Sequence, residues 1–280
     1  MHIPCLMVAA GKVKTVEDIR YFAESDVIDE ITAGSFTRHA RSGNEEPTFV
    51  EIEPGTYLNA SGLPNGGFSY LERNISGMIE AAGIKRLRIS IAPVEPGDLS
   101  VMTSFLRDYP ITLEVNTSCP NVWQDDKQKP LLCHDRGAFE RALAEVAAAR
   151  GSLRVAVKVS PLSDDLREEI IRLCQTYKID EFITMNTRPK VSTLRDGTQL
   201  LSVPFAGMSG TAIAEEALGE VRKAQEILKK LNISILLVGV GGINSSDMVQ
   251  RMCAAGVDAV QVGSYAFVHG PEVFKRLYAT

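Results

Sequence analysis

The sequence predicts a single (β/α)₈ barrel, and three observations support this fold. The chain has 280 residues, close to the roughly 250 residues usual for such a barrel. Short apolar runs alternate with longer amphipathic segments along the whole chain. The first apolar run leads into Ala9-Ala10-Gly11 and not into a GxGxxG turn, which argues against a doubly wound open sheet. No linker or charge block divides the sequence, so we expect one domain over residues 1–280.

Eight short segments rich in Val, Ile and Leu have the length and composition of strands in a buried parallel sheet. In chain order they are Leu6–Ala10, Ile28–Thr32, Leu87–Ile91, Thr112–Asn116, Arg154–Val159, Glu181–Asn186, Ile235–Val240 and Ala259–Gly263. Such a series of strands, separated by helical segments, predicts a closed barrel.

Six segments between these strands show helical periodicity. They are Val16–Ser25, Phe68–Ala81, Gly137–Ala149, Asp164–Tyr177, Ala212–Leu231 and Ser245–Ala254. Thr15, with Asp18 three positions later, predicts a capped start for the first helix, and Ser163 predicts a cap for the fourth.

Three connections are too long to be simple turns. Residues 33–67 contain the alternating segment Thr48–Tyr57, which predicts a hairpin inserted after the second strand. Residues 117–136 and 187–211 are expected to be long loops. Barrel enzymes place substrate recognition in the loops after their strands.

Composition narrows the class of partner. Apolar residues make up 45%, charged residues 23%, and the net charge is −5. That charge argues against nucleic acid or an anionic membrane as the main partner. The five cysteines are scattered without a CxxC pair, so we expect no disulfide framework and no metal. No segment resembles a signal peptide or a membrane span, so a cytoplasmic location is expected.

Three local features suggest chemistry. Cys119 follows the strand that ends in Asn116, where its thiolate could act as a base or nucleophile, or it could be a small buried cysteine. Lys158, at the end of an internal strand, could tune a cofactor or form a Schiff base. The glycines after the last two predicted strands could form a phosphate site or simple turns.

Ten segments, taken in order, resemble the class 1 dihydroorotate dehydrogenases. They are Ala9-Ala10-Gly11, Ser35-Phe36-Thr37, Arg41-Ser42-Gly43-Asn44, Asn59-Ala60-Ser61-Gly62-Leu63-Pro64-Asn65, Asn116-Thr117-Ser118-Cys119-Pro120-Asn121, Val157-Lys158-Val159-Ser160-Pro161, Asn186-Thr187, Gly207-Met208-Ser209-Gly210, Gly239-Val240-Gly241-Gly242-Ile243 and Val262-Gly263-Ser264. Each segment alone is a weak signal, but their shared order across nearly the whole chain is specific.

The resemblance implies an FMN enzyme that oxidises dihydroorotate to orotate in pyrimidine biosynthesis, with Cys119 as the base and Lys158 beside the flavin. The substrate-binding residues that it implies are Asn59, Gly62, Leu63, Asn116, Asn121, Asn186 and Thr187. The cofactor-binding residues that it implies are Ala9, Ala10, Gly11, Ser35, Asn59, Asn116, Lys158, Met185, Ser209, Gly210, Gly241, Gly242, Gly263 and Ser264. It also implies a homodimer and a soluble electron acceptor such as fumarate. An iron–sulfur cluster, if one is used, would come from a partner subunit.

The sequence departs from this family at Gly34, where the family carries a lysine, and at Ser61, where it carries a methionine. Losing one charged hydrogen bond to an anion costs about 1.5–3 kcal/mol. Lys12, Lys14 and Arg38 are the nearby cations that could compensate.

Two alternative functions therefore stay open. One is an FMN-dependent dehydrogenase or reductase of an uncharged cyclic substrate such as a dihydropyrimidine, in which case Gly34→Lys should improve orotate binding. The other is a Schiff-base aldolase that uses Lys158 as its nucleophile, which leaves Cys119 and the asparagines without a role. A non-catalytic flavin-binding relative is a further possibility, against which the presence of Cys119 argues.

Overall fold

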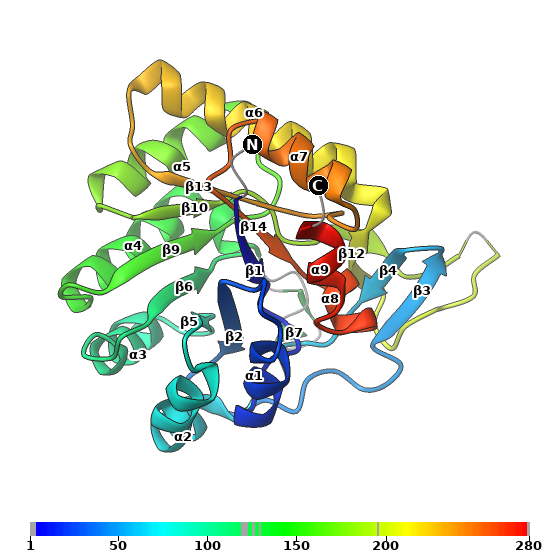
Figure 1. Cartoon of the computed structure of the whole chain (residues 1–280), viewed down its shortest axis with the longest axis horizontal. Coiled ribbons are helices and arrows are strands. Elements are labelled where there is room, and N and C mark those ends of the chain that lie inside the picture. The colour runs from blue at the N-terminus through cyan, green and yellow to red at the C-terminus, as the bar shows by residue number, and fades with distance from the viewer. Residues whose placement is uncertain (1–3, 119–122, 125–126, 129, 195, 279–280) are drawn as a thin grey trace.

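Eight parallel strands close into a barrel in the order β1-β14-β13-β10-β9-β6-β5-β2 (Figure 1). They are β1 (Cys5–Val8), β2 (Glu30–Phe36), β5 (Arg86–Ile91), β6 (Thr112–Asn116), β9 (Arg154–Lys158), β10 (Glu181–Ile183), β13 (Leu236–Val240) and β14 (Ala259–Val262). This computed structural model describes residues 4–118, 123–124, 127–128, 130–194 and 196–278. The predicted fold class is confirmed, and all eight predicted strands are present, Thr112–Asn116 with the predicted ends and the others with shifted ends.

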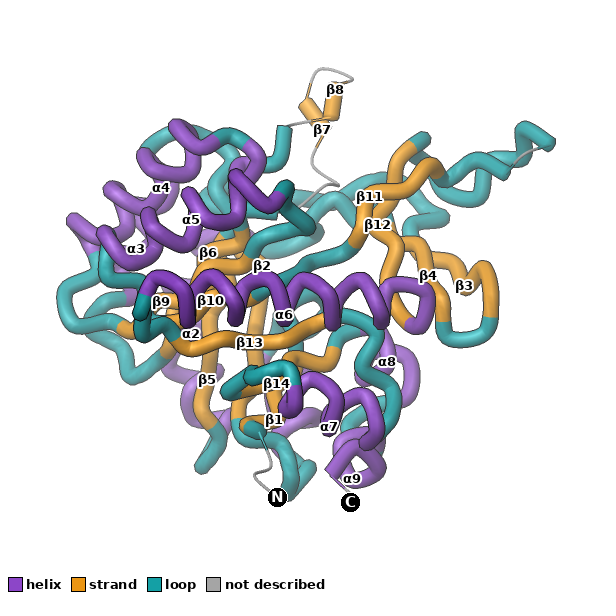
Figure 2. The backbone as a smooth tube through the Cα atoms, turned by 90° about the horizontal axis from the view of Figure 1, so that it is seen from above, coloured by secondary structure: helices purple, strands orange, loops and turns teal. Residues whose placement is uncertain are grey.

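Helices surround the barrel, as the tube in Figure 2 shows. They are α1 (Val16–Ala23), α2 (Gly67–Ala82), α3 (Asp98–Leu106), α4 (Arg136–Ala149), α5 (Asp164–Thr176), α6 (Ala214–Leu231), α7 (Ser246–Ala254), α8 (Ser264–His269) and α9 (Val273–Tyr278). The six helices expected from periodicity are α1, α2, α4, α5, α6 and α7. Helices α3, α8 and α9 were not predicted.

The two predicted helix caps have different outcomes. Thr15 accepts a hydrogen bond from the Asp18 N–H while the Asp18 side chain accepts from the Thr15 N–H, which is a complete capping box. Ser163 occupies the N-cap of α5, but its side chain makes no capping hydrogen bond. The prediction of the second cap was therefore right about the position of the capping residue and wrong about its hydrogen bond.

The predicted hairpin is half of a larger sheet. Strands β3 (Phe49–Glu53) and β4 (Thr56–Asn59) pair with each other, and β4 also pairs with β12 (Phe205–Gly210), which pairs with β11 (Arg188–Val191). We call these four strands the insertion sheet. Segment 187–211, expected to be a loop, supplies half of it, so that expectation was wrong. Segment 117–136 likewise contains β7 (Trp123–Gln124), β8 (Lys127–Gln128) and a 3₁₀ turn at Leu132–His134.

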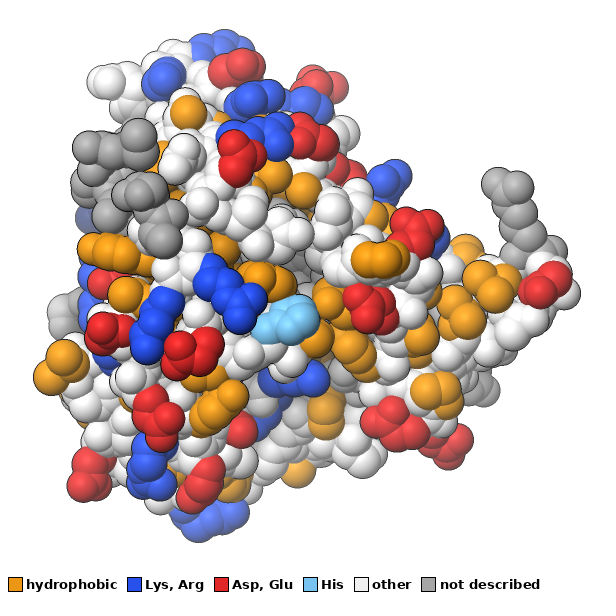
Figure 3. All heavy atoms as spheres, turned by 45° about the vertical axis from the view of Figure 1, so that its right-hand side comes forward, with side chains coloured by type: hydrophobic (Ala, Val, Ile, Leu, Met, Phe, Trp, Pro, Cys, Tyr) orange, Lys and Arg blue, Asp and Glu red, His pale blue; other side chains and the backbone are white. Residues whose placement is uncertain are grey.

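The insertion sheet lies at the end of the barrel opposite the two termini (Figure 2). Hydrophobic side chains gather over this part of the surface (Figure 3). Phe49, Val191, Leu194 and Phe205 are between 37% and 50% exposed. Phe49 stacks on Tyr57 with ring centroids 5.3 Å apart. The exposed Phe49 ring therefore packs directly on the buried Tyr57 ring.

The barrel interior carries an ion cluster near the amino ends of the strands. Arg88 is fully buried; its Nε lies 2.7 Å from Glu30 Oε1 and its Nη2 lies 2.6 Å from Glu181 Oε2. Glu30 and Glu181 are the first residues of β2 and β10 and are almost fully buried. We call Arg88, Glu30 and Glu181 the lower cluster. It joins three strands that are far apart in the sequence.

Candidate active site

A cavity of about 430 Å³ opens where the strands end, within the size range usual for small-molecule sites. Its wall combines the carboxyl ends of the barrel strands with the insertion sheet and α8. Every described residue that the resemblance implied for substrate or cofactor lines this one cavity: Ala9, Ala10, Gly11, Ser35, Asn59, Gly62, Leu63, Asn116, Lys158, Met185, Asn186, Thr187, Ser209, Gly210, Gly241, Gly242, Gly263 and Ser264. The roles of these residues remain predictions, but the structure brings all of them to one cavity.

The predicted base Cys119 and the predicted ligand Asn121 lie outside the described residues. The chain on either side of this segment is anchored to β9. The Thr117 N–H donates to the Lys158 carbonyl oxygen at 3.1 Å, and the Cys133 N–H donates to the Thr117 carbonyl oxygen at 3.0 Å. The start and return of the loop are therefore held beside Lys158.

The four described cysteines offer no alternative base. Cys5, Cys133, Cys174 and Cys253 do not line the cavity. Burial raises the pKa of each thiol, that of Cys5 to about 12. Thiols of this kind are poorly ionised at neutral pH, so Cys119 remains the cysteine candidate.

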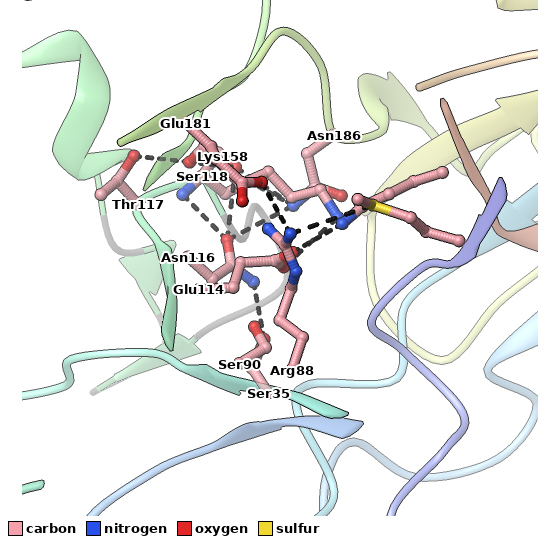
Figure 4. Close-up of polar contacts among 12 residues, drawn as sticks. Ser35, Arg88, Ser90, Glu114, Asn116, Thr117, Ser118, Lys158, Glu181 and Asn186 are labelled. Carbon is pink, nitrogen blue, oxygen red and sulfur yellow. Dashed lines mark hydrogen bonds and ion pairs between the residues drawn. The ribbon is translucent and has the colours of Figure 1, made fainter. Parts of the chain in front are cut away.

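Amide side chains from separate strand ends meet at the cavity floor (Figure 4). Asn116 Nδ2 donates to Ser35 Oγ at 2.9 Å, and Asn116 Oδ1 accepts from the Ser118 N–H at 3.1 Å. Asn186 Nδ2 donates to Ser118 Oγ at 3.1 Å. Asn59, on β4, donates to the Gly207 carbonyl oxygen at 3.3 Å. The cavity thus brings together three of the four asparagines that the resemblance implied for substrate binding.

A second ion cluster lies beneath these amides (Figure 4). Lys158 Nζ lies 3.4 Å from Glu114 Oε1, and Gln261 Nε2 donates to Glu114 Oε2 at 2.8 Å. We call Lys158, Glu114 and Gln261 the upper cluster. Lys158 and Gln261 line the cavity, and Gln261 Oε1 accepts no hydrogen bond among the described residues. Gln261 Oε1 is therefore available to accept a hydrogen bond from a molecule bound in the cavity.

The charges of the upper cluster act on one another. Burial alone would raise the pKa of Glu114, but the charges of Lys158 and Arg88 and hydrogen bonds from Gln261 and Ser90 hold that pKa below its usual range. Burial lowers the pKa of Lys158, and the Glu114 carboxylate opposes this effect. Glu114 therefore stays ionised beneath the cavity and supports a positive charge on Lys158.

The glycines expected to approach a phosphate divide into two groups. A Cβ at Gly242 would lie 2.5 Å from the Ala214 Cα, and a Cβ at Gly241 would lie 2.8 Å from the Ala217 Cβ. These glycines are required for packing against α6, whatever the cavity binds. A Cβ at Gly263 would meet only ordinary contacts, the nearest at 3.6 Å. Packing therefore does not account for Gly263, which lines the cavity.

A pair of hydroxyl groups lies near Gly263. Ser209 Oγ, from β12, and Ser264 Oγ, from the start of α8, are 2.7 Å apart, and both serines line the cavity. Two hydroxyls and a glycine backbone form a polar end to the cavity, separate from the amide floor.

Of the three cations proposed to replace the lysine at position 34, Lys12 and Lys14 line the cavity, and Arg38 is not among its lining residues. Gly34 has φ of +122°, and a Cβ there would lie 2.3 Å from the Ser90 carbonyl oxygen. A side chain at this position requires the backbone to move. Gly34→Lys is therefore not a clean test of substrate charge.

Sequence reasoning missed some residues of the site. Gln261 was assigned only to a strand, although it is the one polar residue in the Ala259–Val262 run, and that was the available signal. Tyr265 and Phe267, which also line the cavity, belong to the unpredicted α8. The described part of the chain contains no group of His, Cys, Asp and Glu side chains suited to a metal. None of its helices has the length and apolar character that crossing a membrane requires.

Comparison of the whole sequence with known proteins identifies the family that the chain resembles. The sequence profile described as dihydroorotate dehydrogenase matches residues 2–280. Proteins of Streptococcus uberis and Streptococcus pyogenes, assigned by name to dihydroorotate dehydrogenase A (fumarate), are each 26% identical over 98% of this chain and 86% of their own length.

A solved structure gives independent support for the fold. The dihydroorotate dehydrogenase of Eimeria tenella, in complex with ferulenol, matches with a TM-score of 0.80 over 97% of this chain and 79% of that chain. At 18% identity this likeness concerns the fold alone. The profile match over nearly all residues, on a barrel whose mouth gathers the expected side chains, shows that the chain belongs to the dihydroorotate dehydrogenase family and is an oxidoreductase of that type.

Proposed function

We propose that the chain binds FMN and oxidises dihydroorotate to orotate, with Cys119 as the base and fumarate as the electron acceptor. The observation that carries the proposal is one cavity with two different ends. Its floor offers amides above a buried lysine, and its other end offers two serine hydroxyls beside Gly263. A flavin mononucleotide needs both kinds of surface, one for its ring and one for its phosphate.

The residues present fit FMN. Gln261 Oε1, which has no hydrogen-bond partner in the described part of the chain, and the buried Lys158 ammonium offer an acceptor and a donor at the cavity floor. The space left at Gly263 allows a backbone N–H to approach a phosphate. When bound, FMN supplies a two-electron acceptor for hydride.

The chain's own residues then have distinct tasks. Lys158 provides a positive charge where negative charge develops on reduction. Asn59, Asn116 and Asn186 orient a planar ring, because amides offer both donors and acceptors to alternating C=O and N–H groups. Cys119 takes the proton from one ring carbon of dihydroorotate, while hydride leaves the adjacent carbon.

Family membership favours this redox chemistry over the Schiff-base aldolase, which we do not propose. An uncharged cyclic substrate is the second candidate. It is favoured by Gly34, which provides no cation on β2.

The proposal is tested by mixing the purified protein with dihydroorotate in the absence of oxygen. We expect a yellow protein whose heat-released chromophore is FMN, bleaching on addition of dihydroorotate, and recovery of colour with fumarate. Cys119→Ala should stay yellow and bleach about 10²-fold more slowly or worse. A protein that cannot be loaded with FMN contradicts the cofactor, and a yellow protein that dihydroorotate does not bleach contradicts the substrate.

We also propose that two copies associate through the exposed apolar part of the insertion sheet. Phe205 and Val191 are paired neighbours on β12 and β11 and are 40% and 50% exposed. Sedimentation should give a dimer that Phe205→Lys dissociates. A monomeric wild-type protein would contradict this association.

A further inference from the structure

Buried hydrogen bonds join the upper cluster to the amide floor of the cavity. Ser90, on β5, is paired in register with Glu114 on β6, and the Ser90 hydroxyl donates to the Glu114 carboxylate. Ser90 Oγ also lies 2.9 Å from Ser35 Oγ, and Asn116 Nδ2 donates to Ser35 Oγ at 2.9 Å. A chain of hydrogen bonds therefore runs from Asn116 through two serines to the Glu114 carboxylate (Figure 4).

The two ends of this chain have different surroundings. Ser90 and Glu114 are fully buried and are not among the residues that line the cavity. Ser35 and Asn116 do line it, and Asn116 is 7% exposed. Ser90 can therefore act on a bound molecule only through the residues to which it is hydrogen-bonded. Glu114 could also act through Lys158, so Ser90 is the member that isolates the chain.

The ionised carboxylate fixes the direction of every hydrogen bond in the chain. A carboxylate can only accept hydrogen bonds, and a hydroxyl group has one proton to donate. Ser90 donates its proton to Glu114, so it must accept from Ser35. Ser35 has then used its own proton, so it must accept from Asn116. The nitrogen of the Asn116 amide, and not its oxygen, therefore faces Ser35.

The other side of the Asn116 amide agrees with this orientation. Asn116 Oδ1 accepts from the Ser118 N–H at 3.1 Å, and a backbone N–H can only donate. The amide is thus held with its nitrogen toward Ser35 and its oxygen toward Ser118. An amide nitrogen has two N–H groups. The bond to Ser35 uses one of them, and the other can donate to a carbonyl oxygen of a molecule in the cavity.

We infer that Ser90 and Glu114 are positioning residues that hold the Asn116 amide as a hydrogen-bond donor toward a ring carbonyl. The inference rests on the proposed function for the identity of the ring, and it requires that ring to present a carbonyl oxygen beside Asn116. Without the Ser90 hydroxyl, the Ser35 proton is no longer committed. Ser35 can then donate to Asn116 Oδ1, and the amide can take either orientation.

The first test needs no substrate. The protein is prepared with isotope-labelled asparagine, and the side-chain amide signals are recorded by NMR, with Asn116→Ala to assign those of Asn116. The wild type should give one sharp pair of Asn116 signals, because the amide has one orientation. Ser90→Ala should broaden or double this pair. The matched control is Ser192→Ala, which removes another buried hydroxyl, one that donates to the Val203 carbonyl oxygen, and should leave the Asn116 signals unchanged.

The second test measures the equilibrium binding of orotate to the flavin-loaded protein through the change in flavin absorbance. Ser90→Ala should weaken binding by about 2–12-fold, the usual range for one neutral hydrogen bond, and Ser192→Ala should leave it unchanged. Asn116→Ala should weaken binding at least as much as Ser90→Ala. The double variant should match Asn116→Ala alone, because Ser90 acts through Asn116 and the two losses are then not additive in free energy. Flavin content and melting temperature are recorded for each variant.

Two results would overturn the inference. One is a Ser90→Ala variant that keeps a single sharp pair of Asn116 signals at the wild-type positions. The other is a double variant in which the losses of Ser90→Ala and Asn116→Ala multiply, since Ser90 would then act independently of Asn116. If the flavin-loaded wild type does not bind orotate, the proposed substrate fails, and the NMR measurement alone decides the role of Ser90.

Discussion

The lower and upper clusters are both buried charges inside one barrel, but they are built differently. In the lower cluster, Arg88 makes short contacts of 2.7 and 2.6 Å with two carboxylates. In the upper cluster, Lys158 meets one carboxylate at 3.4 Å, and Gln261 Oε1 has no partner among the described residues. No residue of the lower cluster lines the cavity, whereas Lys158 and Gln261 of the upper cluster do.

Burial alone therefore does not identify a functional charge. Charged residues are rarely buried without a partner, and the lower cluster satisfies that requirement with two carboxylates around one guanidinium, although Arg88 Nη1 has no hydrogen-bond partner among the described residues. The chemistry is expected where a buried charge is held in place and also lines the cavity, as Lys158 does. Substitutions in the two clusters should therefore affect different properties of the protein.

The largest effect is expected from Arg88→Met. This change leaves Glu30 and Glu181 buried without their shared partner, and breaking a buried ion pair costs about 3–5 kcal/mol. Urea unfolding should show this loss, while the fraction that stays folded keeps its reaction rate per bound flavin. The control is Arg172→Met, which removes a surface pair with Glu168 and should cost about 1 kcal/mol or less. Equal losses from both variants would mean that the lower cluster has no special structural role.

The second largest effect is expected from Lys158→Gln. A glutamine can still donate a hydrogen bond to Glu114, so the stability loss should be smaller than for Arg88→Met. Removal of the charge should slow flavin reduction by about 10²–10³-fold, the usual cost of one electrostatic contact to developing charge. Anaerobic stopped-flow absorbance measures the rate. A variant that reduces its flavin at the wild-type rate would remove Lys158 from the proposed chemistry.

Gly34→Ala tests the close approach of β2 to β5. The added Cβ meets the Ser90 oxygen at 2.3 Å in a left-handed backbone region, and such strain costs about 1–3 kcal/mol. Gly97→Ala is the matched control, because Gly97 also has positive φ but nothing lies within 4 Å of an added Cβ. Thermal unfolding should show the greater loss for Gly34→Ala. If the control loses as much, the contact with Ser90 is unimportant.

Gly263→Ala is expected to have the smallest effect on the fold. Its Cβ would meet only ordinary contacts, so stability without ligand should change by less than about 0.5 kcal/mol. FMN affinity should fall about 10-fold, which corresponds to about 1.4 kcal/mol. Gly242→Ala should instead lower stability, because its Cβ would lie 2.5 Å from Ala214. An unchanged FMN affinity in Gly263→Ala would remove this glycine from the phosphate end.

Much of the barrel could be predicted because each strand is a local apolar run. Of the insertion sheet only the β3–β4 hairpin could be predicted, since β4 also pairs Asn59 with Gly207, and nothing local links residues so far apart. Helix α3 was missed because the Pro93–Gly97 stretch before it is typical of a loop, and its Val101 and Thr103 are weak helix formers.

The site was predicted better than the charges beneath it. The cavity residues lie in recognisable segments such as Asn186-Thr187 and Val262-Gly263-Ser264. Glu30, Arg88 and Glu181 lie at or near the starts of apolar runs, where a charged residue normally faces solvent, so their burial appears only once the barrel closes. The placement of Lys14 against Ser35 likewise depends on backbone pairing between two loops.

The most direct measurement compares the rate at which dihydroorotate bleaches bound flavin, per mole of flavin, in the wild type, Lys158→Gln and Arg88→Met. We predict a rate near that of the wild type for the folded fraction of Arg88→Met and a rate about 10²–10³-fold lower for Lys158→Gln. Equal rates in the two variants, or a slower reaction in Arg88→Met, would contradict the assignment of the chemistry to the upper cluster.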